Sequence, residues 1–357
     1  MRVKKLNMQR RDFLILAAAG VTAASLDTDF IRQAMATDSY ALQAGETAID
    51  LGDTGNNLTN CWLYNGACPG PMLRRRQGDM LNVTVTNDLP VPTTVHWHGI
   101  RNVNEMDGVP NLTQAPIEPG DNFVYQVPLR ESGTYWYHAH NIGWEQVARG
   151  LYGPLIIDAD DDPAVDHDFT LMIDDWRLDQ DGQIDAASFG SLHDWSHGGR
   201  LGNWLTVNGT SNPSLSAKPG SRLRLRLISA ANARVFKIKI GGAAATLIAQ
   251  DGAVCRPENI DVITLAPAQR ADLIVDMDGD SIILQEVSTG TPFPAGRIIA
   301  DPQLGDAKIE KTPIQLALPP RLPDLQNIRT IPVHMQGGAM GNLTEAVFEG
   351  NSLPLGT

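Results

Sequence analysis

Short stretches in which apolar and polar residues alternate recur along most of this chain. One runs from Leu81 to Asn87, and others span residues 123–127 and 133–137. A period of two is typical of β-strands with one buried face, because successive side chains point to opposite sides of a strand. Glycine and proline are plentiful, at 33 and 23 residues, and turn signals such as Asn65-Gly66 separate the stretches. The pattern predicts an all-β protein with many turns.

The strand pattern occurs twice. A first unit is expected over residues 41–158 and a second over 169–302, joined by an acidic segment that carries Pro163. The turn and strand at 65–83 align with 208–225 in the second unit. Two tandem β-sandwiches are therefore predicted. The proline-rich residues 303–357 are predicted to form an extended linker.

Four of the eight histidines lie in two His-x-His stretches, His96-Trp97-His98 and His138-Ala139-His140. On a strand, the two histidines of each stretch share one face. If the two strands are neighbours, four imidazoles converge, and such a set favours copper, zinc, iron or nickel over calcium or magnesium. A single His-x-His is more often an exposed or hydrogen-bonded pair. Two of them, each beside aromatic residues, predict a metal site, and the ligands alone leave zinc open.

The N-terminal residues 1–36 have the pattern of a targeting segment. Basic residues end at Arg10-Arg11, an apolar run continues to Ala24, and Ala34-Met35-Ala36 offers a cleavage site. The apolar run is too short for a stable membrane span. The arginine pair before Asp12-Phe13-Leu14 predicts a twin-arginine signal, with an ordinary secretory signal as the alternative. A periplasmic or extracellular location is expected.

The net charge limits the possible binding partners, and the cysteine content limits the possible disulfides. The formal net charge of −13 argues against nucleic acids and anionic membrane surfaces. Three cysteines make no disulfide framework. Cys61 and Cys68 flank a turn and could pair in an oxidising compartment, although two packed free thiols are the favoured expectation.

Several motifs together resemble the exported, laccase-like bacterial multicopper oxidases. They are His96-Trp97-His98-Gly99, Asp107-Gly108-Val109-Pro110, the stretch 133–140, and the phrase Gly-Leu-Tyr-Gly-Pro-Leu-Ile at 150–156. The resemblance covers nearly all of the chain that follows the signal segment. It implies cupredoxin-like Greek-key β-sandwiches, a copper cofactor, and one-electron oxidation of a small substrate coupled to four-electron reduction of O2 to water. The reducing substrate, a phenol or a metal ion, stays open.

The resemblance also implies roles for individual residues. In this family a trinuclear copper cluster lies between the first and last domains, and a mononuclear copper lies in the last. Carried across, His96 would bind the type 2 copper, and His98, His138 and His140 the paired type 3 coppers. Asp107 would deliver protons to the cluster. The competing interpretation of Asp107 is a turn residue before Gly108, because Asp-Gly turns are common.

The sequence departs from the family in one respect. The His-Cys-His motif of the last copper domain does not occur in it, and none of the three cysteines has a flanking histidine. We therefore expect half of the trinuclear ligands, no mononuclear site, and a chain that is truncated before a third domain and inactive alone. The alternatives are a non-catalytic periplasmic copper-binding or envelope-assembly cupredoxin protein, a small zinc or iron enzyme, and a copper carrier. Loss of the His-x-His pairs would favour the first, and this chain keeps both.

Overall fold

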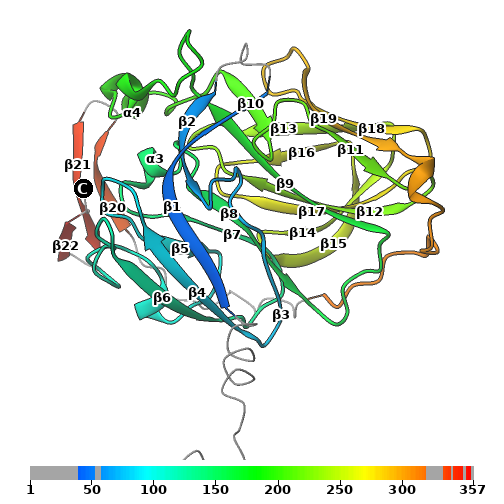
Figure 1. The fold of residues 1–357 in the computed structure, drawn as a ribbon, viewed down its shortest axis with the longest axis horizontal. Coiled ribbons are helices and arrows are strands. Elements are labelled where there is room, and N and C mark those ends of the chain that lie inside the picture. The colour runs from blue at the N-terminus through cyan, green and yellow to red at the C-terminus, as the bar shows by residue number, and fades with distance from the viewer. Residues whose placement is uncertain (1–38, 53–57, 319–332, 339–340, 349–350, 355–357) are drawn as a thin grey trace, which may run out of the picture. The chain divides into compact units, whose positions relative to one another are not determined.

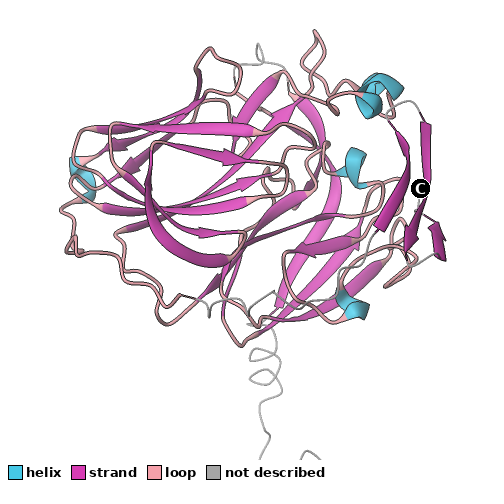
Figure 2. Cartoon of the chain, turned by 180° about the vertical axis from the view of Figure 1, so that it is seen from behind, coloured by secondary structure: helices cyan, strands magenta, loops and turns pink. Residues whose placement is uncertain are grey.

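The structure, a computed structural model, describes residues 39–52, 58–318, 333–338, 341–348 and 351–354. Almost all regular structure in these residues is β-strand, as Figures 1 and 2 show. The predicted signal segment 1–36 lies outside the described residues. Among the described residues, no helix has the length and apolar character needed to cross a bilayer.

The first sandwich consists of two four-stranded sheets, with strand orders β2-β1-β4-β6 and β3-β8-β7-β5. The alternation read from the sequence produces its core, because Leu81, Val83 and Val85 of one strand are fully buried between polar neighbours. Trp97 and Tyr125 fill the same core from both sheets. The strands are β1 (Ser39–Ile49), β2 (Thr59–Tyr64), β3 (Leu73–Arg76), β4 (Met80–Asn87), β5 (Val95–His98), β6 (Asn122–Pro128), β7 (Gly133–Ala139) and β8 (Tyr152–Asp158).

The second sandwich pairs a six-stranded sheet, β10-β9-β12-β17-β14-β15, with a five-stranded sheet, β11-β19-β18-β13-β16. Leucine, isoleucine and valine side chains from both sheets form its core, around the fully buried Phe236. The strands are β9 (His167–Trp176), β10 (Trp204–Val207), β11 (Ser214–Ala217), β12 (Arg222–Ser229), β13 (Phe236–Gly241), β14 (Ala245–Gln250), β15 (Ala253–Ile260), β16 (Val262–Leu265), β17 (Arg270–Asp276), β18 (Ser281–Glu286) and β19 (Phe293–Ala300). The prediction of two tandem all-β sandwiches is confirmed.

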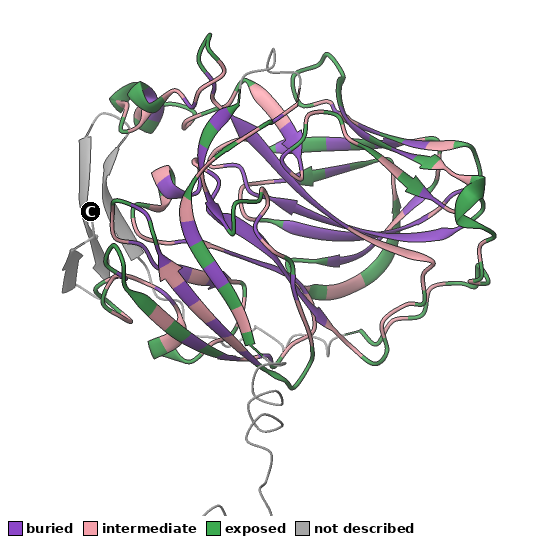
Figure 3. Ribbon diagram, viewed as in Figure 1, coloured by how far each residue is buried: buried purple, intermediate pink, exposed green. Residues whose placement is uncertain are grey.

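A third hydrophobic cluster joins the two sandwiches. Leu63, Trp136 and Tyr152 of the first pack with Trp176 and Ile228 of the second, and all five are buried. Figure 3 shows that buried residues continue from the strands of one sandwich to those of the other. Removing this much apolar surface from water fixes the two sandwiches against each other.

Buried ion pairs lie beside this cluster. In β12, arginines alternate with leucines, so that Leu225 enters the core while Arg226 points out of the second sandwich. Arg226 is 1% exposed; its Nε lies 2.7 Å from Asp168 Oδ1, and its Nη1 donates to Thr134 Oγ1 of the first sandwich at 2.9 Å. The same guanidinium lies 3.5 Å from the buried Asp272. The arginine face of β12 is therefore an interdomain surface.

Helices are short throughout the described residues, and three further strands lie near the C-terminus. The predicted extended linker contains an antiparallel sheet of order β20-β21-β22, an element that the proline content did not predict. These elements are η1 (Asn104–Met106), α3 (Gly143–Gln146), η2 (Ala186–Ser188), α4 (Leu192–Ser196), η3 (Pro302–Leu304), β20 (Val333–Gly338), β21 (Gly341–Phe348) and β22 (Asn351–Pro354).

Candidate metal centre

The two His-x-His stretches lie on neighbouring antiparallel strands, β5 and β7. The register pairs His96 with His138 and Trp97 with Tyr137. Paired residues point to the same face of a sheet, so the histidines share one face and the two aromatic side chains the other. Trp97 and Tyr137 are completely buried in the first sandwich. This packing fixes the register, because a slip of one residue would put the histidines into the core.

The four imidazoles converge. The His96 ring centroid lies 5.7 Å from that of His98, 5.5 Å from that of His138 and 5.2 Å from that of His140. Ring nitrogens of His96, His98 and His138 all lie within 4.8 Å of one another. His140 follows the end of β7 and adds its ring beside this triad. The expected convergence of four rings is present.

Hydrogen bonds orient two of the rings toward the centre. His96 Nδ1 lies 2.7 Å from the carbonyl oxygen of Asp107, and His138 Nδ1 lies 2.9 Å from that of Ala139. A carbonyl only accepts, so each Nδ1 donates and each Nε2 keeps a lone pair. His138 Nε2 faces His98 Nδ1 at 3.2 Å. A metal-binding histidine usually has this arrangement, with the second nitrogen bonded to a fixed acceptor.

Burial keeps these rings in the form that binds metal. Desolvation lowers the pKa of His98 to about 4, assisted by the positive charge of Arg270. Desolvation also lowers the pKa of His138 well below its ordinary value. The pKa of His140 is lowered for the same reason. Neutral imidazole is the ligand form, so the site is prepared for a cation near neutral pH.

Asp107 lies at the edge of the cluster in a turn that packs on β5. Its Oδ1 is 3.6 Å from His96 Nδ1, and its side chain is 31% exposed. Gly108 has φ +78°, and a Cβ there would lie 1.8 Å from the carbonyl oxygen of Val95. Only glycine fits this close approach. The turn therefore holds the Asp107 backbone and carboxylate against His96.

The second sandwich supplies a side chain to the same region. Arg270 at the start of β17 is 5% exposed, and its Nε donates to the carbonyl oxygen of Thr134 in β7 at 3.2 Å. Asp251 holds its Nη1 at 3.1 Å, and its guanidinium lies 5.7 Å from the Tyr135 ring centroid. Arg270 of the second sandwich thereby supports β7, the strand that carries His138.

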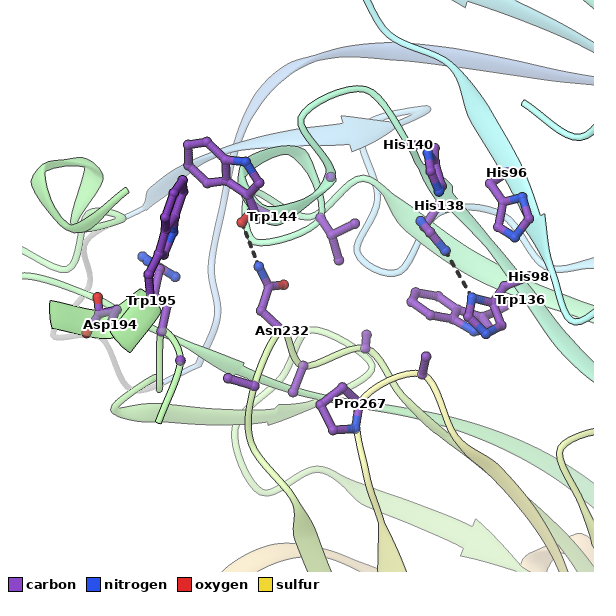
Figure 4. A pocket seen from close by; sticks show the side chains of 18 of the residues that line it. His96, His98, Trp136, His138, His140, Trp144, Asp194, Trp195, Asn232 and Pro267 are labelled. Atoms are coloured by element: carbon purple, nitrogen blue, oxygen red, sulfur yellow. Dashed lines mark hydrogen bonds between the residues drawn. The ribbon is translucent and has the colours of Figure 1, made fainter. Parts of the chain in front are cut away.

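A cavity of about 480 Å³ opens beside the histidines. The four histidines and Trp136 line one side, and Figure 4 shows Trp144, Trp195 and Asn232 across from them. Asn232 Nδ2 donates to the Trp144 carbonyl oxygen at 2.6 Å, which ties the second sandwich to helix α3. The cavity is thus walled by both sandwiches.

The sequence located the four histidines and Asp107 but missed their surroundings. Trp136 packs against His138 with ring centroids 4.3 Å apart, and it lies within the 133–140 motif. No local pattern marks Arg270 or Asn232, because they come from distant segments that only the docking of the sandwiches brings near. Cys61, Cys68 and Cys255 are free thiols, as favoured from the sequence.

Comparisons with known proteins agree with this architecture. Two sequence profiles described as multicopper oxidase match residues 47–162 and 167–283. A solved multi-copper oxidase from Pseudomonas thermotolerans is 32% identical, with a TM-score of 0.72 over 80% of this chain and 69% of that one. The structure of Lac15 from a marine microbial metagenome is 35% identical, with a TM-score of 0.64 over 82% of this chain and 72% of that one.

Curated relatives give the same result. The multicopper oxidase MmcO of Mycobacterium tuberculosis is 32% identical over 76% of this chain and 58% of its own length. A copper resistance protein A homolog of Pseudomonas syringae is 30% identical over 74% of this chain and 51% of its own length. The chain thus spans about half the length of the curated relatives it matches. By sequence profile and fold alike, this chain belongs to the multicopper oxidase family.

Proposed function

We propose that this chain is a copper-binding unit of a laccase-like oxidase. The reaction is one-electron oxidation of a small substrate coupled to four-electron reduction of O2 to water. The observation that carries the proposal is the convergence of four imidazoles on one cavity wall. Membership of the multicopper oxidase family supports copper as the metal.

The donor set fits copper. Among the residues that converge at this point, all metal-directed atoms are imidazole nitrogens, a ligand type that suits copper, zinc, iron and nickel. The divalent metals bind such nitrogen sites in an order that peaks at Cu²⁺. No carboxylate or thiolate belongs to the triad of converging ring nitrogens in the described residues. The site therefore favours copper over calcium or magnesium.

Individual roles follow from the family resemblance. His96 would bind the type 2 copper, and His98, His138 and His140 the type 3 pair. Copper at this site would pass electrons from the reducing substrate to O2. The chain itself holds the rings in place through the carbonyls of Asp107 and Ala139. Trp136 covers the His98 and His138 rings and keeps water from that side.

Asp107 is proposed to hand protons from solvent to the cluster. Its carboxylate is partly exposed and lies 3.6 Å from His96, so it contacts both water and the ligand shell. A carboxylate in this position can exchange protons with bulk water and release them toward the cavity. Asp107→Asn should slow reoxidation of the reduced, copper-loaded chain by O2 in a single turnover, whereas Asp107→Glu should largely restore it. Equal rates for all three proteins would refute the relay role.

The reducing substrate belongs to one of two classes. Some relatives are named laccases and others copper resistance proteins, so a phenol and a metal ion such as Cu(I) are the two candidates.

We further propose that residues 1–36 direct export by the twin-arginine pathway. Replacing Arg10-Arg11 with two lysines should then abolish export, while an unchanged secreted fraction would contradict it.

Copper analysis tests the proposal. Four histidines cannot give three copper ions a full ligand set, so we expect the 357-residue chain alone to bind one or two copper ions at this site. We expect neither a blue absorption band nor sustained oxygen uptake with a phenolic substrate. Copper content that does not change in His138→Ala would overturn the proposed site. Sustained turnover would overturn the expectation that the ligand set is half complete.

A further inference from the structure

A second pair of histidines lies on helix α4, away from the four that converge on β5 and β7. His193 is in the helix, and His197 follows its last residue. His197 has non-helical backbone angles, and the contact between the two rings shows that both side chains lie on the same side of this turn. The ring centroids lie 4.4 Å apart with the ring planes 24° from parallel, and both residues are exposed.

Hydrogen bonds fix the tautomer of His197. Its Nδ1 lies 3.0 Å from the carbonyl oxygen of His193, which can only accept. Nδ1 also lies 3.1 Å from Ser196 Oγ, whose own proton goes to the Leu192 carbonyl oxygen at 2.7 Å. Nδ1 is therefore protonated, and Nε2 of His197 has a free lone pair. This is the same arrangement that orients His96 and His138, in which a backbone carbonyl fixes the nitrogen that does not bind metal.

The pair lies on a helix that borders the cavity holding the inner histidines. Asp194 and Trp195, between the two histidines in sequence, line that cavity together with His98 and His140. Asp194 is already engaged, because its Oδ2 accepts from Arg177 Nη1 at 2.9 Å. The available ligand atoms on this turn are thus the two imidazoles, with open positions left for water.

We propose that His193 and His197 form a second copper site, an exposed two-nitrogen site for Cu(II) beside the cavity. Two imidazoles suit Cu(II), Ni(II) and Zn(II), and affinity among these ions is highest for Cu(II). Water completes the coordination. The site depends on none of the four inner histidines, so it stands or falls independently of the proposed oxidase function.

The experiment titrates Cu(II) into the full chain and follows the electron paramagnetic resonance spectrum and the copper bound per chain. His193→Ala and His197→Ala should each weaken one Cu(II) site at least about tenfold and change its nitrogen hyperfine pattern from two nitrogens to one. The matched control combines His193→Ala with Leu192→His. That variant keeps the number of histidines but breaks the four-residue spacing, at an exposed position, and it should behave like His193→Ala.

The inner cluster provides the internal comparison. In His96→Ala with His140→Ala, this second site should remain with an unchanged spectrum. A Cu(II) titration that is identical in wild type, His193→Ala and His197→Ala would overturn the proposal. Retention of the site in the spacing control would overturn it as well, because binding would then not need the facing pair. Tighter binding of Zn(II) than of Cu(II) would overturn the choice of metal.

Discussion

His138 shows how a residue's surroundings decide its chemistry. The ring is enclosed by Trp136, His98 and His96, and it donates to a backbone carbonyl within its own strand. A charged imidazole there would be unsolvated and would face two like rings, so the neutral form dominates. The lone pair that remains, on Nε2, accepts a hydrogen bond from His98 Nδ1 at 3.2 Å, and a bound metal ion would replace this hydrogen bond.

Replacing His138 tests this at the level of one side chain. Copper at about 100 times its dissociation constant should raise the free energy of unfolding of the wild type by about 2.7 kcal/mol. His138→Ala should lose most of that gain, because a ligand is gone. Thermal or urea unfolding with and without copper measures it. His167→Ala, outside the cluster, is the control and should keep the gain; an undiminished gain in His138→Ala would contradict the ligand role.

Asp174 is a second residue whose environment sets its protonation. It is 5% exposed and accepts from Tyr152 Oη and from the Asp175 backbone N–H, both at 2.8 Å. Burial, followed by the neighbouring Asp175 charge, raises its pKa from 3.8 to about 7. The folded state therefore holds a proton between pH 4 and 7 that the unfolded state releases. This contribution to stability is present at low pH and is lost as the pH rises to 7.

Asp174→Asn should remove that dependence. Between pH 5 and 8, we expect the wild type to lose about 2 kcal/mol of stability through this group, and the variant to lose correspondingly less. Urea unfolding at several pH values measures the difference. Asparagine keeps an acceptor oxygen for Tyr152. Parallel pH profiles for both proteins would show that Asp174 is ionised throughout.

At the level of elements, the histidine strands were predictable and the turn that supports them was only partly so. Period-two alternation predicted that His96 and His98 point to the same face, because residues two apart on a pleated strand lie on the same side. The Asp107-Gly108 turn was recognisable as a turn. Its contact with β5 was not, because the approach of Gly108 to the Val95 carbonyl depends on how the loop returns across the sheet.

Gly108→Ala tests that contact. The new methyl group would collide with the Val95 carbonyl oxygen in a backbone conformation that alanine adopts poorly, so we expect a loss of about 3 kcal/mol. Copper affinity should fall about tenfold as well, because the Asp107 carbonyl orients His96. Gly120→Ala is the matched control: its φ is +86° but nothing lies within 4 Å, so about 1 kcal/mol is expected. Equal losses would mean that strain alone, not the contact, matters at Gly108.

At the scale of the whole molecule, the tandem repeat was readable from the sequence and the interface between its halves was not. Arg224 and Arg226 alternate with leucines, a pattern that is equally typical of a strand with one solvated face. The structure instead buries these arginines against carboxylates and the first sandwich. The partners are distant in sequence, so no periodicity could have revealed them.

Arg226→Met should expose the importance of this network. It removes the partner that lies 2.7 Å from Asp168 and the more distant partner of Asp272, and breaking a buried ion pair costs about 3–5 kcal/mol. Urea unfolding measures the loss. Arg76→Met is the control, because its pair with Asp160 is exposed and worth less than about 1 kcal/mol. If both arginine variants lose equally little, the interdomain network does not stabilise the protein.

The shared cluster around Trp136, Tyr152 and Trp176 has one more consequence. If the chain ended at residue 158, the sandwich with all four histidines would expose a large apolar surface to water, which is rare in soluble monomers. The carbonyl oxygen of Thr134, in the strand that carries His138, would also lose its hydrogen bond from Arg270. The second sandwich thus keeps the histidine-bearing sandwich soluble by covering its apolar face. Transferring this centre to another scaffold would require both sandwiches, or polar substitutions on the exposed face.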